Sequence, residues 1–305
     1  MKVDKNTINN LLKNQNYVLF LAFFLGIFLS KFAIHTKNIT IPALIAVMTI
    51  SSIEISLKDF FPLSKIARPV LIGIISNYII LSVVILSLAW FLIPDQELWK
   101  GFVIVAVSPP AVLIIPFTKI FKGNISLSIT GTFGTYFTAI IIAPLVAFLL
   151  LGENLINPLK LIIILFELII IPLILSRLLL LKYNIKNIEK YQSPVVNIGL
   201  FIVFYTVVGL NRQALLGEPK MVGMISIIAF SSFFILKFFI EFILNKLKVS
   251  KKTQISIILM GTIKNTGFAA VTALSLFGAK AAIPPAVFSV FIVIYLIYLG
   301  ISFRI

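Results

Sequence analysis

A lysine followed by an asparagine, a threonine and a glycine lies within a long apolar stretch, between Met260 and Phe268. If this stretch crosses a bilayer, Lys264 lies near mid-depth. A lysine there costs about 2.5–3.5 kcal/mol unless it faces protein, water or a partner. Thr266-Gly267, directly after it, easily interrupts a helix. A charge beside a helix break at the midplane is typical of the binding sites of secondary transporters.

A second interruption is predicted at Ser108-Pro109-Pro110, also within an apolar stretch. Proline removes a backbone donor and clashes with the preceding turn, so two prolines in a row break a helix. If the two breaks cross, the N-termini of their half-helices present partial positive charge and free N–H groups to one point. With Lys264 added, that point suits an anion. The candidate substrate-binding residues are Ser108, Pro109, Pro110, Lys264, Asn265 and Thr266.

The composition restricts the class of protein. The chain has 305 residues, of which 60% are hydrophobic and 12% charged, and its mean hydropathy is +1.13. These values predict an all-α integral membrane protein whose partner is the lipid bilayer. The net charge of +16 does not predict nucleic acid as a partner, because the basic residues lie in short loops between apolar runs. One histidine and ten acidic residues favour neither a metal site nor an enzyme.

The apolar runs predict ten transmembrane helices, at about 20 residues per crossing. The predicted spans are 17–34, 40–56, 68–93, 97–121, 124–151, 157–181, 193–211, 220–246, 252–277 and 281–303. The segment around Lys182 to Lys190 is predicted to be a polar surface loop. Lysine and arginine are more frequent in the loops on the side of the N-terminus. This asymmetry places both termini in the cytoplasm, in a cell (inner) membrane.

The spacing also predicts a five-plus-five inverted repeat, 1–151 and 152–305. An offset of 155 residues places Pro110 on Asn265 and Gly123 on Gly278, so both broken spans (4 and 9) break thirteen residues before a closing glycine. A second half of five spans lies upside down relative to the first, which is a plan used by secondary transporters.

Two segments resemble a known family. The run from Ser108 through Lys122-Gly123-Asn124 to Ala143-Pro144-Leu145 is similar to spans 4 and 5 of the bile acid:sodium symporter family, and Gly261–Ala270 is similar to its span 9. The resemblance implies a core domain from spans 3–5 and 8–10, which holds the crossing helices. A panel domain is built from spans 1, 2, 6 and 7, and transport proceeds by alternating access.

The family's sodium ligands are mostly missing. By that resemblance, a Ser-Asn pair of span 4 is replaced by Ile114 and Ile115, a glutamate of span 9 by Met260, and a glutamine by Lys264. What remains of the former cation sites is Ser128 and Thr132 in span 5 and Asn77 in span 3. Isoleucine and methionine offer no oxygen to a hard cation. The resemblance thus implies no cofactor, and it disfavours sodium as the coupling ion.

Lys264 has two interpretations. An ammonium standing where a sodium ion sat can hold the crossing helices together electrostatically. The same buried lysine could instead release its proton during the cycle, which makes transport proton-linked. Glu167, the other clearly intramembrane charge, is a candidate gate or a packing partner of a polar group. Lys237 and Glu241, four residues apart, predict an internal ion pair.

The sequence therefore predicts a secondary transporter of a small organic anion, sodium-independent and either proton-linked or a uniporter. Two alternatives are an efflux carrier of the related arsenite or auxin-carrier type and a sodium-coupled symporter with altered sites. A membrane-embedded enzyme is disfavoured, because no carboxylate pair, histidine cluster or nucleophile constellation lies at membrane depth. The paired broken helices count against a channel or a receptor.

Overall fold

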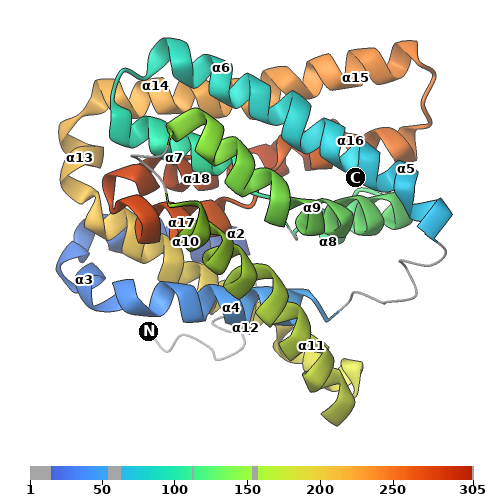
Figure 1. The fold of residues 1–305 in the computed structure, drawn as a ribbon, viewed down its shortest axis with the longest axis horizontal. Coiled ribbons are helices and arrows are strands. Elements are labelled where there is room, and N and C mark those ends of the chain that lie inside the picture. The colour runs from blue at the N-terminus through green and yellow to red at the C-terminus, as the bar shows by residue number, and fades with distance from the viewer. Residues whose placement is uncertain (1–14, 54–62, 112, 153–156, 304–305) are drawn as a thin grey trace, which may run out of the picture.

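The computed structural model describes residues 15–53, 63–111, 113–152 and 157–303, and the regular elements in these ranges are all helical (Figure 1). The α-helices are α2 (Gln15–Phe28), α3 (Ala33–Thr36), α4 (Thr40–Ser51), α5 (Leu63–Ile74), α6 (Ser82–Leu92), α7 (Gln96–Val107), α8 (Ile114–Ile120), α9 (Ile125–Leu151), α10 (Pro158–Leu165), α11 (Ile171–Lys182), α12 (Ile185–Leu210), α13 (Arg212–Gly217), α14 (Pro219–Phe230), α15 (Leu236–Lys246), α16 (Lys251–Thr262), α17 (Thr266–Phe277) and α18 (Ile283–Ser302). Three π-helical segments join α-helices end to end: η4 (Ile75–Leu81), η5 (Phe166–Ile170) and η6 (Ser231–Ile235). The 3₁₀ turns are η1 (Ser30–Phe32), η2 (Lys37–Ile39) and η7 (Lys280–Ala282).

Seven helical segments within the described ranges are long and apolar enough to cross a membrane, where the sequence predicted ten crossings. The seven are Ser30–Ser51, Ile66–Leu92, Ile125–Leu151, Pro158–Lys182, Lys190–Leu210, Pro219–Lys246 and Lys280–Ser302. Helix α2, which is 14 residues long, covers only residues 17–28 of the predicted span 17–34. The predicted spans 97–121 and 252–277 are each divided into two short helices, α7 with α8 and α16 with α17.

The surface loop expected from Lys182 to Lys190 is mostly absent. Helix α11 continues to Lys182 and α12 begins at Ile185, so the break in helical structure is confined to Tyr183 and Asn184. Residues 186–190 belong to the first turns of α12. The polar composition of this segment ended the predicted span too early, because a helix can continue past the apolar part of a membrane crossing.

Both predicted interruptions are present, and they contact each other. Helix α7 ends at Val107, and Pro109 and Pro110 follow without the N–H groups that would continue it. Helix α16 ends at Thr262, and α17 begins with Asn265 as its N-cap. Pro110 and Lys264 form an isolated antiparallel bridge, and the Asn265 N–H donates to the Pro109 carbonyl at 2.9 Å. Backbone groups freed by one interruption are therefore satisfied by the other, as burial requires.

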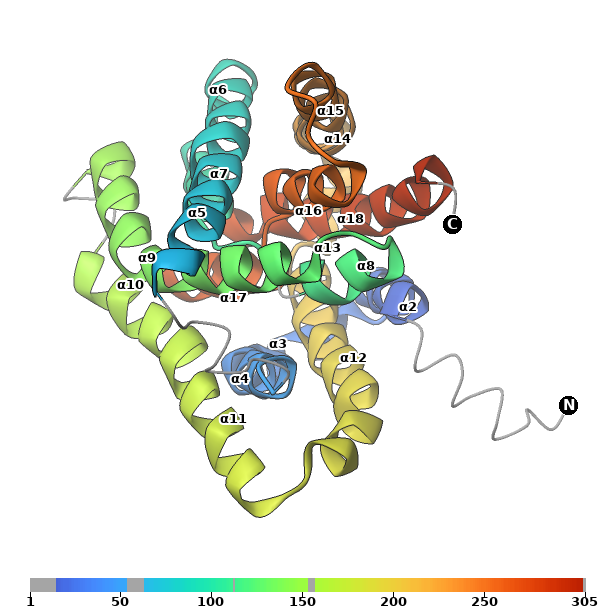
Figure 2. The ribbon, with the colours of Figure 1, turned by 90° about the vertical axis from the view of Figure 1, so that its right-hand side faces the viewer.

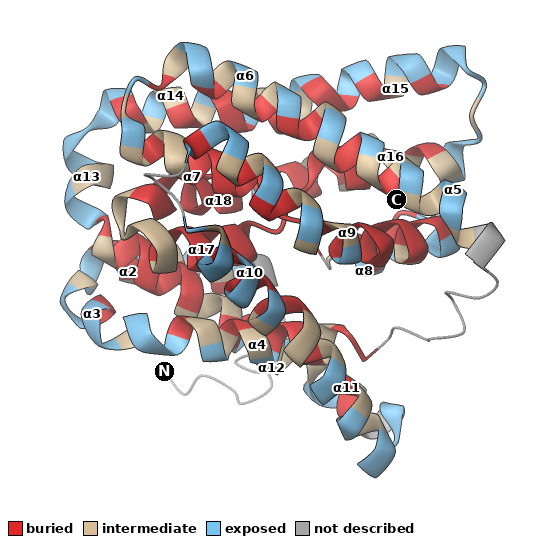
Figure 3. Cartoon of the chain, viewed as in Figure 1, coloured by how far each residue is buried: buried red, intermediate tan, exposed pale blue. Residues whose placement is uncertain are grey.

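The helices fall into two packed groups on either side of the interruptions. Helices α2 and α4 pack against α12, and α11 packs against α4. Figure 2 shows α4, α11 and α12 at one side of the molecule and α6, α7, α14 and α15 at the other, with α17 and α9 between them. Burial is greatest along α7, α17 and α18, whereas α13 and much of α15 are exposed (Figure 3). The two interruptions thus lie in the most enclosed part of the chain.

Close helix approach at Gly101 leads to a stability prediction. A Cβ atom at this position of α7 would lie 2.2 Å from the Ala281 carbonyl oxygen, whereas one at Gly223 of α14 would meet no atom within 4 Å. We expect Gly101→Ala to destabilise the protein by about 1–3 kcal/mol through overpacking. Gly223→Ala, the matched control, is expected to be neutral or to stabilise by up to about 1 kcal/mol through helix propensity. Thermal unfolding of both variants in detergent tests this, and equal midpoints would contradict the packing argument.

An ion pair joins the N-terminal end of α7 to the first residue of η7, Lys280. The Asp95 carboxylate accepts from the Leu98 N–H at 3.0 Å as the N-cap of α7, and from the Lys280 ammonium at 2.7 Å. Partial burial opposes the charged carboxylate, but the hydrogen bonds from Lys280 and the Leu98 N–H together with the positive charge of Lys280 outweigh it and lower the pKa of Asp95.

A carboxylate with a lowered pKa contributes stability above its unfolded pKa of about 3.9, and that contribution is lost as the pH falls further. We therefore expect Asp95→Asn, which retains a capping side chain, to reduce stability at pH 7 by no more than about 1 kcal/mol, because the pair is partly exposed. The difference from the wild type should shrink as the pH falls below about 3.9. Unfolding midpoints of both proteins at pH 7 and pH 3 measure this, and a difference as large at pH 3 as at pH 7 would rule out the ion pair as its source.

Candidate functional site

The ammonium of Lys264 lies in a cage of oxygen atoms at the point where the two interruptions meet. Its Nζ lies 2.7 Å from Asn77 Oδ1, 3.1 Å from Ser82 Oγ, 2.6 Å from the Ala106 carbonyl and 3.0 Å from the Ser108 carbonyl. The residue is 1% exposed. Among the described residues, no carboxylate lies within ion-pair distance of it.

The C-terminal end of α7 supplies the negative potential that a carboxylate would otherwise provide. Ala106 belongs to the last turn of α7 and Ser108 is its C-cap. Carbonyls at a helix C-terminus are unpaired and carry partial negative charge, which stabilises a nearby cation. The face of the Tyr78 ring adds to this, with its centroid 4.6 Å from Nζ. Lys264, which lies in the second interruption, therefore caps the C-terminal end of α7.

Asn77 connects the caps of both broken helices. Its Nδ2 donates to the Met260 carbonyl at 2.9 Å and lies 3.4 Å from the Ile263 carbonyl, at the end of α16. Its Oδ1 accepts from Lys264, which caps α7. One buried amide thus holds the C-terminal ends of α7 and α16 at fixed positions relative to α5–α6. This explains why a fully buried asparagine is tolerated.

The cage includes Ser82, which the sequence analysis did not identify. Residues 77 and 82 would lie about 140° apart around a regular α-helix, at 100° per residue. The π-helical segment η4 widens the turn to i→i+5 spacing, and Ser82 Oγ lies 3.0 Å from the Asn77 carbonyl and 2.7 Å from the Ala106 carbonyl. The π turn thus places both side chains on one face, and the hydrophobic pattern of the sequence gives no sign of it.

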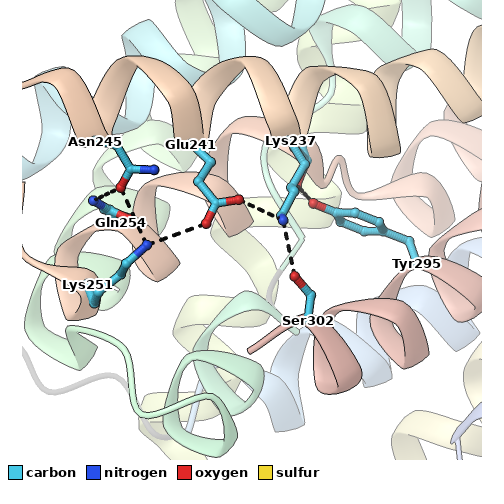
Figure 4. Close-up of polar contacts among 8 residues, drawn as sticks. Lys237, Glu241, Asn245, Lys251, Gln254, Tyr295 and Ser302 are labelled. Carbon is cyan, nitrogen blue, oxygen red and sulfur yellow. Dashed lines mark hydrogen bonds and ion pairs between the residues drawn. The ribbon is translucent and has the colours of Figure 1, made fainter. Parts of the chain in front are cut away.

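A second buried lysine has different surroundings. Lys237 of α15 forms an ion pair with Glu241 at 2.8 Å, as predicted from their spacing, and donates to Ser302 Oγ at 3.1 Å (Figure 4). Glu241 also lies 3.5 Å from the ammonium of Lys251, the first residue of α16. A carboxylate thus neutralises Lys237, whereas helix ends and uncharged oxygens surround Lys264. The contrast makes Lys237 a matched control for experiments on Lys264.

Asn265 occupies the opposite, N-terminal side of the second interruption. Its Oδ1 accepts from the Phe268 N–H at 3.0 Å, which caps α17, and its Nδ2 donates to Tyr136 Oη at 2.9 Å. The same Nδ2 lies 3.7 Å from Met48 Sδ of α4. Asn265 is 9% exposed, so its amide reaches a cavity while its backbone stays bound to the first interruption.

That cavity has a volume of about 270 Å³ and separates the two groups of helices. Its walls come from α4, α12, the first interruption with α8, and Asn265. It extends along α4 to Ser51 and along α12 to Gln192 and Ser193, at the end of the molecule where α4 ends and α12 begins. None of the described lining residues is charged. The polar groups are the hydroxyls and amides of Ser51, Gln192, Ser193, Asn197 and Asn265.

A smaller space continues from the cavity past the interruptions. It measures about 40 Å³ and shares Ala111, Leu113, Leu200 and Asn265 with the larger cavity. Lys264, Thr266 and Gly267 line it from the second interruption, and Phe204 of α12 lines it from the other side. The larger cavity thus continues as a narrower space beside the two interruptions, between α12 and the start of α17.

The other sequence-predicted cation-site residues lie apart from the cage contacts. Ser128 Oγ is 2.8 Å from Thr118 Oγ1, and the buried hydroxyl of Thr132 has no hydrogen-bond partner among the described residues. Ile114 and Met260 are fully buried, and Ile115 lines the larger cavity. Of the predicted cation-site set, Asn77 contacts both Lys264 and the Met260 carbonyl, through the hydrogen bonds given above.

Glu167 stays a predicted gate. It lies in the π-helical segment η5, between α10 and α11, and is partly buried. Segment η5 packs against α4, which lines the cavity, but Glu167 is not among the residues that line it. Within the described part of the chain, it forms no ion pair.

Comparison with known proteins agrees with this architecture. A model of the Sodium Bile acid symporter family matches residues 41–218, which include α4, the first interruption and α12. Over 236 residues the chain is 28% identical to a protein of Bacillus subtilis (strain 168) named "Uncharacterized sodium-dependent transporter YocS". The aligned part covers 76% of this chain and 72% of that protein.

Proposed function

Because this chain belongs to the sodium bile acid symporter family, a family of multi-pass membrane transporters and not of enzymes, we propose that it carries a small organic anion by alternating access. The observation that carries this proposal is the contact between the two helix interruptions, Pro110 with Lys264, directly beside a cavity that separates two groups of helices. Discontinuous helices at a midplane site are the means by which secondary transporters bind solutes and ions.

We propose further that the helices form ten crossings in a five-plus-five inverted repeat, 1–151 and 152–305. The π-helical segments support this. Segment η4 covers 75–81, and the repeat offset of 155 residues places it on 230–236, where η6 covers 231–235. The two interruptions obey the same offset. The helix interruptions and the π-helical segments are two independent irregularities. Their equivalent positions favour a repeat over a chance agreement in spacing.

In this proposal α2, α4, α10–α11 and α12 form the panel, and α5–α9 and α14–α18 form the core. The cavity lies between them, with α4 and α12 on the panel side and Asn265 and α8 on the core side. With both termini in the cytoplasm, the cavity extends toward the cytoplasm, because α4 ends there. The structure then corresponds to an inward-facing state, narrowed at Leu200 and Phe204.

The substrate is proposed to bind at Asn265 and the N-terminus of α17, together with Thr266 and the Ser108–Pro110 segment. The walls of the cavity carry no charge, and Lys264 lines only the smaller space beside it, so the site suits a small molecule with no more than one negative charge. The Asn265 amide offers a donor to such a carboxylate, and the dipole of α17 points its positive end toward it.

Lys264 is proposed to replace a coupling sodium ion. Four oxygen atoms within 3.1 Å are the ligand type that hard cations require, and here an ammonium occupies their centre. A tethered cation keeps the α7 and α16 ends together without any external ion. Transport is then sodium-independent, as a uniporter or linked to a proton on Lys264.

A sodium-coupled mechanism is the second candidate. The name of the Bacillus subtilis relative, which calls that protein sodium-dependent, favours it. Ser128 and the unpaired hydroxyl of Thr132 are the oxygen atoms that a sodium ion would use outside the Lys264 cage.

Uptake by the purified protein in proteoliposomes decides between these candidates. Small labelled monocarboxylates should first be selected by their stabilisation of the protein against heat. We expect uptake of a stabilising compound to be equal in sodium and in choline. Uptake that requires a sodium gradient would establish the second candidate. Stabilisation without uptake in any gradient would contradict transport itself.

A further inference from the structure

A second cavity lies on the opposite side of α4 from the proposed substrate path. Its volume is about 520 Å³, and α4, α11 and α12 form its walls. Ile45 and Ala46 of α4 face this cavity, whereas Leu44 and Val47 face the first one. Figure 2 shows α11 and α12 converging at one end of the molecule, with α4 between them. The cavity is the space that these three helices leave open.

The walls are apolar along their length and charged at one end only. Leu178 lines the cavity and is 54% exposed, so this wall is open to the surroundings of the protein. The Thr49 hydroxyl, which also lines it, donates to the Ile45 carbonyl and offers no hydrogen to a ligand. Lys182, the last residue of α11, is exposed and lies at the end of the cavity with Tyr183, the ammonium 5.6 Å from the ring centroid.

The length and position of this cavity match one leaflet of a bilayer. The lining residues of α4 extend from position 42 to 50, which is about 12 Å at 1.5 Å per residue. Half of a hydrocarbon core is about 15 Å thick. Lysine and tyrosine together are typical of the membrane–water interface, and basic pockets between transmembrane helices on the cytoplasmic side bind anionic lipid headgroups.

We propose that this cavity binds an anionic membrane phospholipid, with one acyl chain between α4, α11 and α12 and the headgroup phosphate at Lys182. A solute from water would find no polar partner along the walls, whereas an acyl chain needs none. The cationic end complements the phosphate. Because the lipid would contact α4 and both neighbouring helices, it would fix their relative positions within one side of the protein.

Native mass spectrometry of the purified full-length protein tests this, with phosphatidylglycerol and phosphatidylcholine as probes. We expect the wild type to bind phosphatidylglycerol about fivefold more tightly than phosphatidylcholine, the factor that about 1 kcal/mol per lysine gives. Lys182→Ala should abolish this preference. Ala46→Trp, which fills the cavity, should weaken the binding of both lipids while leaving the unfolding midpoint near that of the wild type.

Lys190→Ala is the matched control, because Lys190 is exposed at the same end of the molecule and its ammonium likewise lies over the ring of the following tyrosine, at 4.9 Å. It does not line the cavity, so its removal should leave lipid binding unchanged. An equal loss in Lys190→Ala and Lys182→Ala would overturn the proposal in favour of non-specific surface charge. Unchanged binding in a folded Ala46→Trp protein would overturn it as well.

Discussion

Replacing Lys264 with alanine is expected to abolish transport in the absence of small cations and to make the stability of the protein depend on them. The substitution removes the ammonium from four buried oxygen atoms: Asn77 Oδ1 and the Ser108 carbonyl lose their donor, whereas the Ser82 hydroxyl still donates to the Ala106 carbonyl. An unsatisfied buried polar group costs about 1–3 kcal/mol, so the loss of stability should reach about 3 kcal/mol or more. The truncated side chain also leaves room among these oxygen atoms.

A sodium or ammonium ion can enter that space and restore the missing charge. We expect both ions to raise the unfolding midpoint of Lys264→Ala and to restore part of its uptake, at constant ionic strength with choline as the reference. Lys264→Met fills the same volume without a charge, so it should be destabilised and show no rescue. The wild type should not respond, because its own ammonium occupies the cage.

Lys237→Ala controls for the loss of any buried lysine. This substitution removes the ion pair with Glu241 and leaves a carboxylate, not a cage of neutral oxygen atoms. Sodium should therefore raise its unfolding midpoint no more than the choline reference does. If sodium stabilises the wild type as strongly as Lys264→Ala, Lys264 does not stand in for the ion. Failure of every cation to affect Lys264→Ala would also contradict the proposed role.

The second large effect is expected at Asn265. Aspartate in its place can still cap α17 and accept from Tyr136, so Asn265→Asp should fold with little change in unfolding midpoint. It places a negative charge on the cavity wall, and like charges opposed in a binding site cost several kcal/mol. We expect the KM for an anionic substrate to rise at least about tenfold, which corresponds to 1.4 kcal/mol.

Asn157→Asp is the matched control for this change. Asn157 is also a helix N-cap, accepting from the Lys160 N–H at 3.2 Å at the start of α10, but it does not line the cavity. Uptake kinetics of the two variants in proteoliposomes should therefore differ. An Asn265→Asp protein with the KM of the wild type would place the substrate elsewhere, and an equal defect in Asn157→Asp would point to helix capping instead of charge.

The residues of the chain determined much of the fold by themselves. Adjacent prolines at 109 and 110 cannot continue a helix. An asparagine before Thr266-Gly267 is a strong N-cap. Both interruptions could therefore be placed from the local chemistry of these residues. The repeat offset is likewise a prediction from spacing alone. Helix ends were less predictable, as at α12, because an amphipathic helix continues past the edge of its apolar run.

Only the tertiary structure decided which groups surround Lys264. The sequence identified the lysine as expensive to bury and Asn77 as a buried amide, but their contact joins residues 187 positions apart. Ser82 joins them through a π turn, and the Ala106 and Ser108 carbonyls are available only because α7 ends there. Every residue has a backbone carbonyl, so the residue type does not show which carbonyls are free to accept a hydrogen bond. For this reason the cage, unlike the helix breaks that create it, could not be derived from residue types.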